Sequence, residues 1–193
     1  FAQGDLALAL VVNTPALLAL PVLLSGTEAQ KARILPMMAE PTLPPFTSAL
    51  LEPGISFDPT HLKTTVHREG DCYVLNGVKC YVPMAKDARM MLVYARDTES
   101  GQIDGYILES GMEGIVVGDR EKLMGVRALP TYGLHLNNVQ VGLDNKLGGE
   151  AGSRYERLLS HGRLGLSAMA VGVARAAFEY ARNYAKERVQ FGH

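Results

Sequence analysis

The hydrophobic and polar positions divide the chain into three stretches. Residues 1–40 carry apolar residues at helical spacing, and Thr27 stands where it can cap a helix that starts at Glu28. Between about 46 and 146, short β-favouring runs alternate with turn residues. From Ser153 onward there is no proline and the helical spacing returns. Helices, then strands, then helices indicate an α+β protein.

The middle stretch has the pattern of an antiparallel sandwich or barrel. Its clearest turn signal is Asn76-Gly77, between CYVL and VKCYV, which predicts a type I′ hairpin. In that register Cys72 and Cys80 point to opposite faces of the sheet. We therefore expect these two cysteines neither to form a disulfide nor to share a metal.

The apolar run from Leu6 to Leu24 is long enough to suggest a membrane span. However, Asn13 and Thr14 lie in its middle, Pro15 and Pro21 interrupt it, and no Lys or Arg precedes it. A secretory signal needs a basic start and a small-residue cleavage site. We expect a helix buried in a globular protein, without a membrane partner.

The amino-acid composition argues against several classes of protein function. The 193 residues are 47% hydrophobic and 20% charged, with a net charge of −1. That balance argues against nucleic-acid binding, although residues 153–193 are locally basic, as a solvated helix face would be. Two cysteines make no disulfide framework and favour the reducing cytoplasm. The five scattered histidines predict no metal site, and no nucleophile elbow or phosphate-binding loop is present.

The segment ERVQFG, Glu187 to Gly192, is expected to end a helix with Arg188 and Phe191 on one side. The arginine could serve the negative end of the helix dipole while the phenylalanine enters the core. Alternatively, the guanidinium could pair with a phosphate and the aromatic ring could pack on a ligand ring. The segment alone leaves both readings open.

An ordered set of motifs resembles the acyl-CoA dehydrogenase family. LEPGISFD (51–58) stands where the family usually has Thr-Glu-Pro-x-x-Gly-Ser-Asp, and GDCYVLNGVKCYVP (70–83) resembles Gly-Asp-x-Tyr-x-Leu-Asn-Gly-x-Lys-x-Trp-Ile-Thr. EKLMGVRALPTYGLHLNNVQV (121–141) follows in the expected order, and residues 162–192 look like the first two helices of the family's C-terminal bundle.

The resemblance implies a domain organisation. Residues 1–44 would be the end of an N-terminal helical domain, residues 45–146 a middle β-domain, and residues 147–193 a linker with the first helices of a C-terminal helical domain. On this reading the chain stops before the second half of the helical bundle.

The family resemblance also implies an FAD site shared between subunits, and hence a homodimer or homotetramer. Leu51 and Phe57 would lie in the loop that holds the isoalloxazine and pyrophosphate, and Arg163 matches a substrate-side arginine. The remaining cofactor-binding positions are Tyr81, Val82 and Pro83 beside the reactive edge of the flavin, and Arg188, Gln190 and Phe191 against the dinucleotide of a neighbouring subunit.

Four of these positions depart from the family pattern. Leu51 replaces Thr, Phe57 replaces Ser, Tyr81 replaces Trp, and Pro83 replaces Thr. Leucine and phenylalanine lack the hydroxyl donors, and proline also lacks a backbone N–H. We therefore expect weaker flavin binding than the family pattern would give.

The activity implied is α,β-dehydrogenation of an acyl-CoA thioester in fatty acid metabolism, with hydride passing to flavin N5 and then to an electron-transfer acceptor. A carboxylate must remove the α-proton. One family variant places this glutamate just before the arginine that matches Arg163, where this chain has Gly162, so no residue is assigned as the base. The alternative is a divergent, non-catalytic subunit of an acyl-CoA dehydrogenase-like hetero-oligomer.

Overall fold

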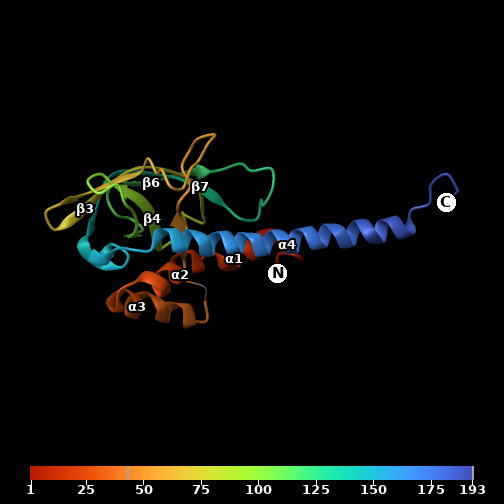
Figure 1. The fold of residues 1–193 in the computed structure, drawn as a ribbon, viewed down its shortest axis with the longest axis horizontal. Coiled ribbons are helices and arrows are strands. Elements are labelled where there is room, and N and C mark those ends of the chain that lie inside the picture. The colour runs from red at the N-terminus through yellow and green to blue at the C-terminus, as the bar shows by residue number, and fades with distance from the viewer. Residues whose placement is uncertain (43, 193) are drawn as a thin grey trace.

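The computed structural model describes residues 1–42 and 44–192, and within them the predicted α+β class is confirmed. Figure 1 shows a curled sheet on one side of a long helix and short helices on the other. The short helices are α1 (Leu6–Asn13), α2 (Ala16–Ser25) and α3 (Glu28–Ile34), followed by a 3₁₀ turn at Leu35–Ala39.

The ends of these helices follow from local side-chain chemistry. Asp5 accepts the Leu8 N–H at 2.9 Å at the start of α1. The predicted cap at Thr27 is confirmed, because its hydroxyl accepts the Gln30 N–H while the Gln30 side chain accepts the Thr27 N–H.

The apolar run from Leu6 to Leu24 does not form the single buried helix that was expected. It breaks at Thr14–Pro15 into α1 and α2, because proline there cannot continue the hydrogen-bond ladder. One face is buried, with Leu18 and Val22 fully covered, whereas Leu8 and Leu23 are more than half exposed.

Among the described residues, no single helix has both the length and the apolar character to cross a membrane, and only α1 with α2, bent by 45°, pass that test together.

Within the described residues, seven strands form one sheet. They are β1 (Phe46–Ala49), β2 (Thr65–Glu69), β3 (Cys72–Pro83), β4 (Met90–Asp97), β5 (Ile103–Glu109), β6 (Ile115–Arg120) and β7 (Thr131–Gly142). The order is β1-β4-β2-β3-β7-β6, with β5 also paired to β4. Most pairings are antiparallel as predicted, but β4 pairs in parallel with both β1 and β2.

The hairpin predicted at Asn76-Gly77 is wrong. β3 runs straight through this dipeptide, and the turn lies earlier, between Glu69 and Cys72. Asn76 instead exchanges two hydrogen bonds with Asn138 of β7, at 2.8 and 2.9 Å, where the register shifts. Cys72 and Cys80 are both free and lie on one extended strand, too far apart to bridge.

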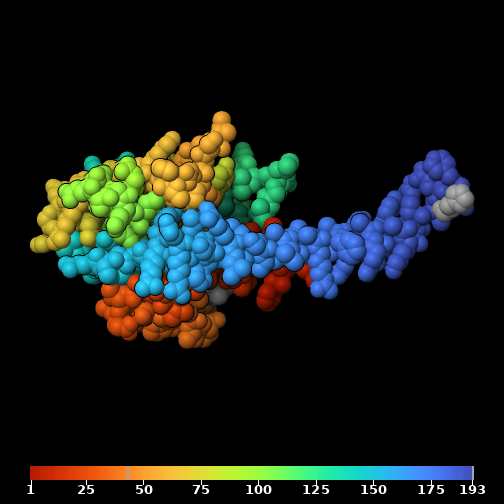
Figure 2. All heavy atoms as spheres, in the orientation of Figure 1, coloured from red at the N-terminus to blue at the C-terminus, as the bar shows by residue number. Residues whose placement is uncertain are grey.

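The C-terminal stretch forms one helix, α4 (Tyr155–Glu187), rather than the two helices implied by the resemblance. Its start packs against β5 and the core, with Leu158 buried, and its second half projects away from the body of the molecule (Figure 2). Most of its side chains are exposed, including Leu164, Val171 and Phe178. The C-terminal residues therefore lie far from the sheet.

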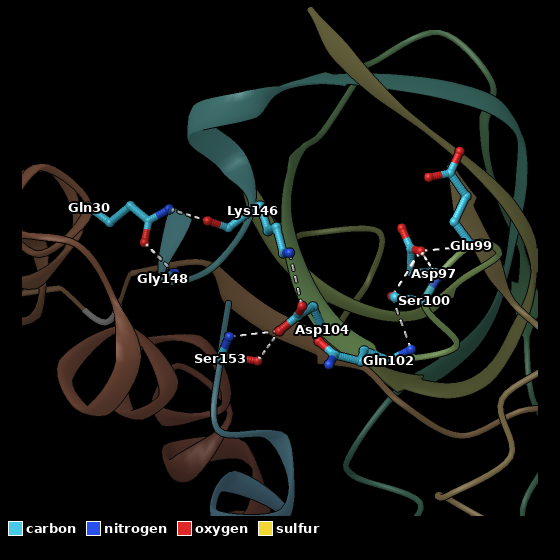
Figure 3. A network of polar contacts seen from close by, with 9 residues as sticks. All are labelled: Gln30, Asp97, Glu99, Ser100, Gln102, Asp104, Lys146, Gly148 and Ser153. Atoms are coloured by element: carbon cyan, nitrogen blue, oxygen red, sulfur yellow. Dashed lines mark hydrogen bonds and ion pairs between the residues drawn. The ribbon is translucent and has the colours of Figure 1, made fainter. Parts of the chain in front are cut away.

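A polar network joins the three parts of the chain (Figure 3). Gln30 of α3 is buried and donates to the carbonyls of Asp144 and Lys146, while its oxygen accepts the Gly148 N–H. Asp104 of β5 pairs with Lys146 Nζ at 3.1 Å and accepts the Ser153 N–H at 2.6 Å, just before α4. These bonds fix where α4 leaves the sheet.

Candidate functional site

The structure brings Leu51 and the end of β3 together. The Leu51 carbonyl accepts the Cys80 N–H at 2.9 Å, and the buried Thr47 hydroxyl donates to the Pro83 carbonyl at 2.6 Å. Both contacts hold the loop after β1 against the last residues of β3. Leu51 is 40% exposed, whereas Val82 is buried. Four of the predicted flavin-binding residues therefore lie together at one edge, where Leu51, Tyr81 and Pro83 are at least partly exposed and Val82 is buried.

Tyr81 gives this edge an unusual backbone. Its φ of +53° lies in the left-handed region, which costs energy for a residue with a side chain. The pairing of β3 with β7 shifts register between Lys79 and Val82, so Tyr81 lies in a bulge. Its N–H donates to the Glu121 carboxylate at 3.1 Å, and half of its side-chain surface is exposed.

Unpartnered polar atoms lie beside the same edge. Glu121 Oε2 and Thr131 Oγ1 are buried and have no hydrogen-bond partner among the described residues, and Thr131 pairs with Pro83 across the sheet. Glu121 also lines an open depression of about 660 Å³ together with Arg120, Lys122 and Arg127. Unsatisfied polar atoms next to an open depression are typical of a ligand-binding edge.

Behind the edge lies a buried ion pair between Lys79 and Glu52. Lys79 Nζ contacts Glu52 Oε1 at 2.9 Å, and the two side chains are 0% and 5% exposed. Burial lowers the pKa of Lys79 to about 8 although Glu52 opposes this change. Burial also raises the pKa of Glu52, but its hydrogen bonds outweigh this effect and lower that pKa below its usual value.

Phe57 is partly buried and packs against the core beneath the N-terminal helices rather than standing free at the edge. The same core takes in Tyr155, whose hydroxyl donates to the Pro59 carbonyl at 2.7 Å and ties the start of α4 to this loop. Arg163 is exposed on α4, near enough that its positive charge opposes the rise in the pKa of Tyr155, which burial brings to about 12.

Arg188, Gln190 and Phe191 are not brought to the edge. The prediction that Arg188 and Phe191 lie on one helical face is wrong, because the helix ends at Glu187. Arg188 adopts an extended backbone and Phe191 has a φ of +53°, which ends the i, i+3 spacing. Phe191 is 93% exposed, and Arg188 donates to the Gln190 side chain at 3.2 Å. All three lie beyond the projecting end of α4 (Figure 1).

Three functional candidates were missed from the sequence: Glu52, Lys79 and Glu121. A lysine inside the apolar β-favouring run VKCYV was the available signal, because buried lysines are rare without a partner. The described residues contain no group of three or more His, Cys, Asp or Glu side chains placed to hold a metal ion.

Comparison with known proteins identifies the family. The model of the acyl-CoA dehydrogenase middle domain matches residues 47–139, and that of the acyl-CoA dehydrogenase C-terminal domain matches residues 153–193. The rat mitochondrial short/branched chain specific acyl-CoA dehydrogenase is 38% identical over 173 residues, which are 86% of this chain and 39% of that protein.

Comparison with solved structures points to the same family. Butyryl-CoA dehydrogenase from Megasphaera elsdenii superimposes with a TM-score of 0.82 and 33% identity, over 100% of this chain and 52% of that one. Glutaryl-CoA dehydrogenase from Mycobacterium smegmatis, in complex with FADH2, gives a TM-score of 0.82 at 25% identity, over 98% of this chain and 49% of that one. The chain thus spans about half the length of these relatives or less. With two family models matched in order and the whole fold shared, the chain belongs to the acyl-CoA dehydrogenase family.

Proposed function

We propose that the protein binds FAD at the edge formed by Leu51 and Tyr81–Pro83 and contributes to α,β-dehydrogenation of an acyl-CoA thioester. The observation that carries this proposal is the contact between Leu51 and Cys80, which assembles the edge from two segments 29 residues apart. The family assignment and the FADH2 named for a related structure support it.

Bound FAD would accept the hydride that leaves the β-carbon of the acyl chain. The residues of this chain would orient the flavin and exclude water from its reactive edge. Tyr81 offers a half-exposed aromatic side chain, and Thr47 holds the Pro83 carbonyl in place. The Cys80 and Tyr81 N–H groups are already engaged, and Pro83 has none.

The edge therefore offers few hydrogen-bond donors to a flavin. Leu51, Phe57 and Pro83 supply no side-chain donor, and each missing charge-assisted hydrogen bond costs about 1.5–3 kcal/mol of binding. We expect FAD to be held less tightly than at a site with threonine and serine in these positions.

The rest of the site would come from other parts of the assembly. We propose that Arg188, Gln190 and Phe191 contact the dinucleotide of a neighbouring copy in a homodimer or homotetramer, and their exposure supports this proposal. Arg163 would lie on the substrate side, and no described residue is proposed as the catalytic base. A separate electron-transfer acceptor is proposed as a further partner.

A second candidate is a non-catalytic subunit of a hetero-oligomer. The packing of Phe57 into the core favours it, because the position that would contact the cofactor serves the fold instead. In that case a partner chain would hold the flavin chemistry.

We also propose the division of the chain at 44/45 and 146/147, supported by family matches that fall inside those segments. The two free cysteines support a reducing compartment, and we propose the cytoplasm.

The test uses protein purified from the complete gene. A yellow protein whose flavin is bleached anaerobically by acyl-CoA thioesters would support the dehydrogenase. A colourless protein that cannot be reconstituted with FAD would support the non-catalytic subunit.

A further inference from the structure

The buried ion pair of Lys79 and Glu52 is unusual, because net stability does not explain its presence. Lys79 Nζ and Glu52 Oε1 are 2.9 Å apart, and both side chains are hidden from solvent. Replacing a buried ion pair by uncharged residues of similar size is often neutral for stability, whereas removing one partner is strongly destabilising. Stability alone therefore does not account for two opposite charges beneath the edge, and the bonds that they make indicate another role.

The pair holds both neighbours of Leu51. Glu52, directly after Leu51, accepts the backbone N–H groups of Lys63 at 2.7 Å and Thr64 at 2.9 Å as well as the Lys79 ammonium. Lys79 also donates to the carbonyl of Leu50, directly before Leu51, at 3.2 Å. Leu51 is thus held from both sides by one pair of charges.

Lys79 and Glu52 also lie next to a part of β3 that is not paired with β7. The ladder between β3 and β7 pairs Lys79 with Leu134 and resumes only at Val82, so β7 does not set the positions of Cys80 and Tyr81. Cys80 bonds to Leu51 instead. The position of this bulge relative to the loop therefore depends on Lys79, two residues before Tyr81, and on its bonds to Leu50 and Glu52.

We propose that Lys79 and Glu52 are positioning residues that set the alignment of Leu51 with Tyr81–Pro83, and so the shape of the flavin edge. This inference rests on the proposed function. Neither residue is catalytic, because neither side chain reaches the surface. Their effect on a bound flavin passes through the backbone of Leu51 and of residues 80–83.

The test compares the double variant Glu52→Gln/Lys79→Met with the unchanged protein. Removing both charges together leaves no buried unpaired charge, so the variant is expected to fold. We expect its dissociation constant for FAD to rise roughly tenfold, since binding to the displaced edge loses about one good hydrogen bond. The visible absorbance and circular dichroism bands of bound flavin are expected to shift as well. A purely structural role would leave these bands in place.

The matched control is Asp104→Asn/Lys146→Met, which removes a second, largely buried ion pair at the α4 joint. It is expected to leave FAD affinity and the flavin bands unchanged, whatever its effect on stability. If the control weakens FAD binding as much as the Lys79 variant, the effect is general and the proposal is overturned.

A milder variant covers the case in which the double variant does not fold. Glu52→Asp keeps the charge and withdraws it by one methylene, and we expect FAD to bind several-fold more weakly with displaced flavin bands. Wild-type affinity and bands in either folded variant would overturn the positioning role and leave the proposed function standing. If the unchanged protein binds no FAD, the proposed function fails and this inference fails with it.

Discussion

The N–H of Tyr81 donates to the carboxylate of Glu121 at 3.1 Å, and this bond holds a non-glycine residue at a φ of +53°. The two residues are 40 positions apart, and the bulge in β3 leaves Tyr81 without a partner on β7 in the strand register. A strained backbone at the proposed flavin edge is thus stabilised by one side chain from outside the strand.

Removing that side chain tests its role. Glu121→Ala is expected to lower the free energy of unfolding by about 0.5–1.5 kcal/mol, because the partly exposed Tyr81 N–H loses its acceptor. Urea unfolding measures the change. Glu113→Ala removes an exposed glutamate and should change stability by less than about 0.5 kcal/mol. Equal effects in the two variants would show that the bond to Tyr81 contributes nothing.

Stability is expected to be more sensitive to loss of Asp104, which holds the start of α4 through Lys146 and Ser153. Asp104→Ala leaves the Lys146 ammonium and the Ser153 N–H without their acceptor, and should cost about 3 kcal/mol. Hydrogen exchange should increase first at the start of α4. Asp97→Ala, in the turn on the right of Figure 3, removes bonds to Ser100 and should cost about 1 kcal/mol. Unchanged exchange at residues 153–158 would contradict the role of this joint.

Gly77 is required by the close approach of another segment. Its φ is +153°, and a Cβ there would lie 2.6–2.8 Å from atoms of Thr64, including the backbone Cα at 2.7 Å. Gly77→Ala is therefore expected to lower the free energy of unfolding by about 2–4 kcal/mol. Gly125→Ala, where a Cβ meets nothing within 4 Å, is the control and should be nearly neutral. A thermal melt of each variant decides between these outcomes.

Lys79 should leave a signature in the dependence of stability on pH. Burial lowers its pKa to about 8 in the folded protein, from the ordinary 10.5. Between these values the unfolded chain holds a proton that the folded chain has released, so the contribution of Lys79 to stability becomes more favourable as pH rises. The double variant Glu52→Gln/Lys79→Met, which leaves no unpaired buried charge, should remove this rise from urea unfolding measured between pH 8 and 10. An identical pH slope in the variant would contradict the low pKa of Lys79.

Local chemistry explains which features could be predicted from the sequence. Thr27 and Gln30 lie three residues apart, so the helix start they form was readable. Asn76-Gly77 has the local pattern of a hairpin, yet its outcome is decided by Asn138, 62 positions away. Likewise, the pairing of Glu52 with Lys79 joins residues 27 positions apart, and only the folded chain reveals it.

In the candidate site too, some features could be predicted from the sequence and others depend on distant parts of the chain. The ordered motifs predicted that Leu51 and Tyr81–Pro83 belong to one site, and in the structure the Cys80 N–H bonds to the Leu51 carbonyl, so that the two segments lie side by side. The motifs did not show that Phe57 turns into the core, because that depends on its packing against distant parts of the chain. Nor did they show that α4 would end at Glu187, three residues before Gln190.

A crystal structure of protein from the complete gene, grown with FAD, decides whether Leu51 and Tyr81–Pro83 form one face of an FAD site. We expect the isoalloxazine ring to contact Leu51, Tyr81 and Pro83, with Lys79 and Glu52 still paired beneath them. A structure in which Phe57 and Pro83 fill that space, and FAD is absent or bound elsewhere, would show that these residues do not form the site.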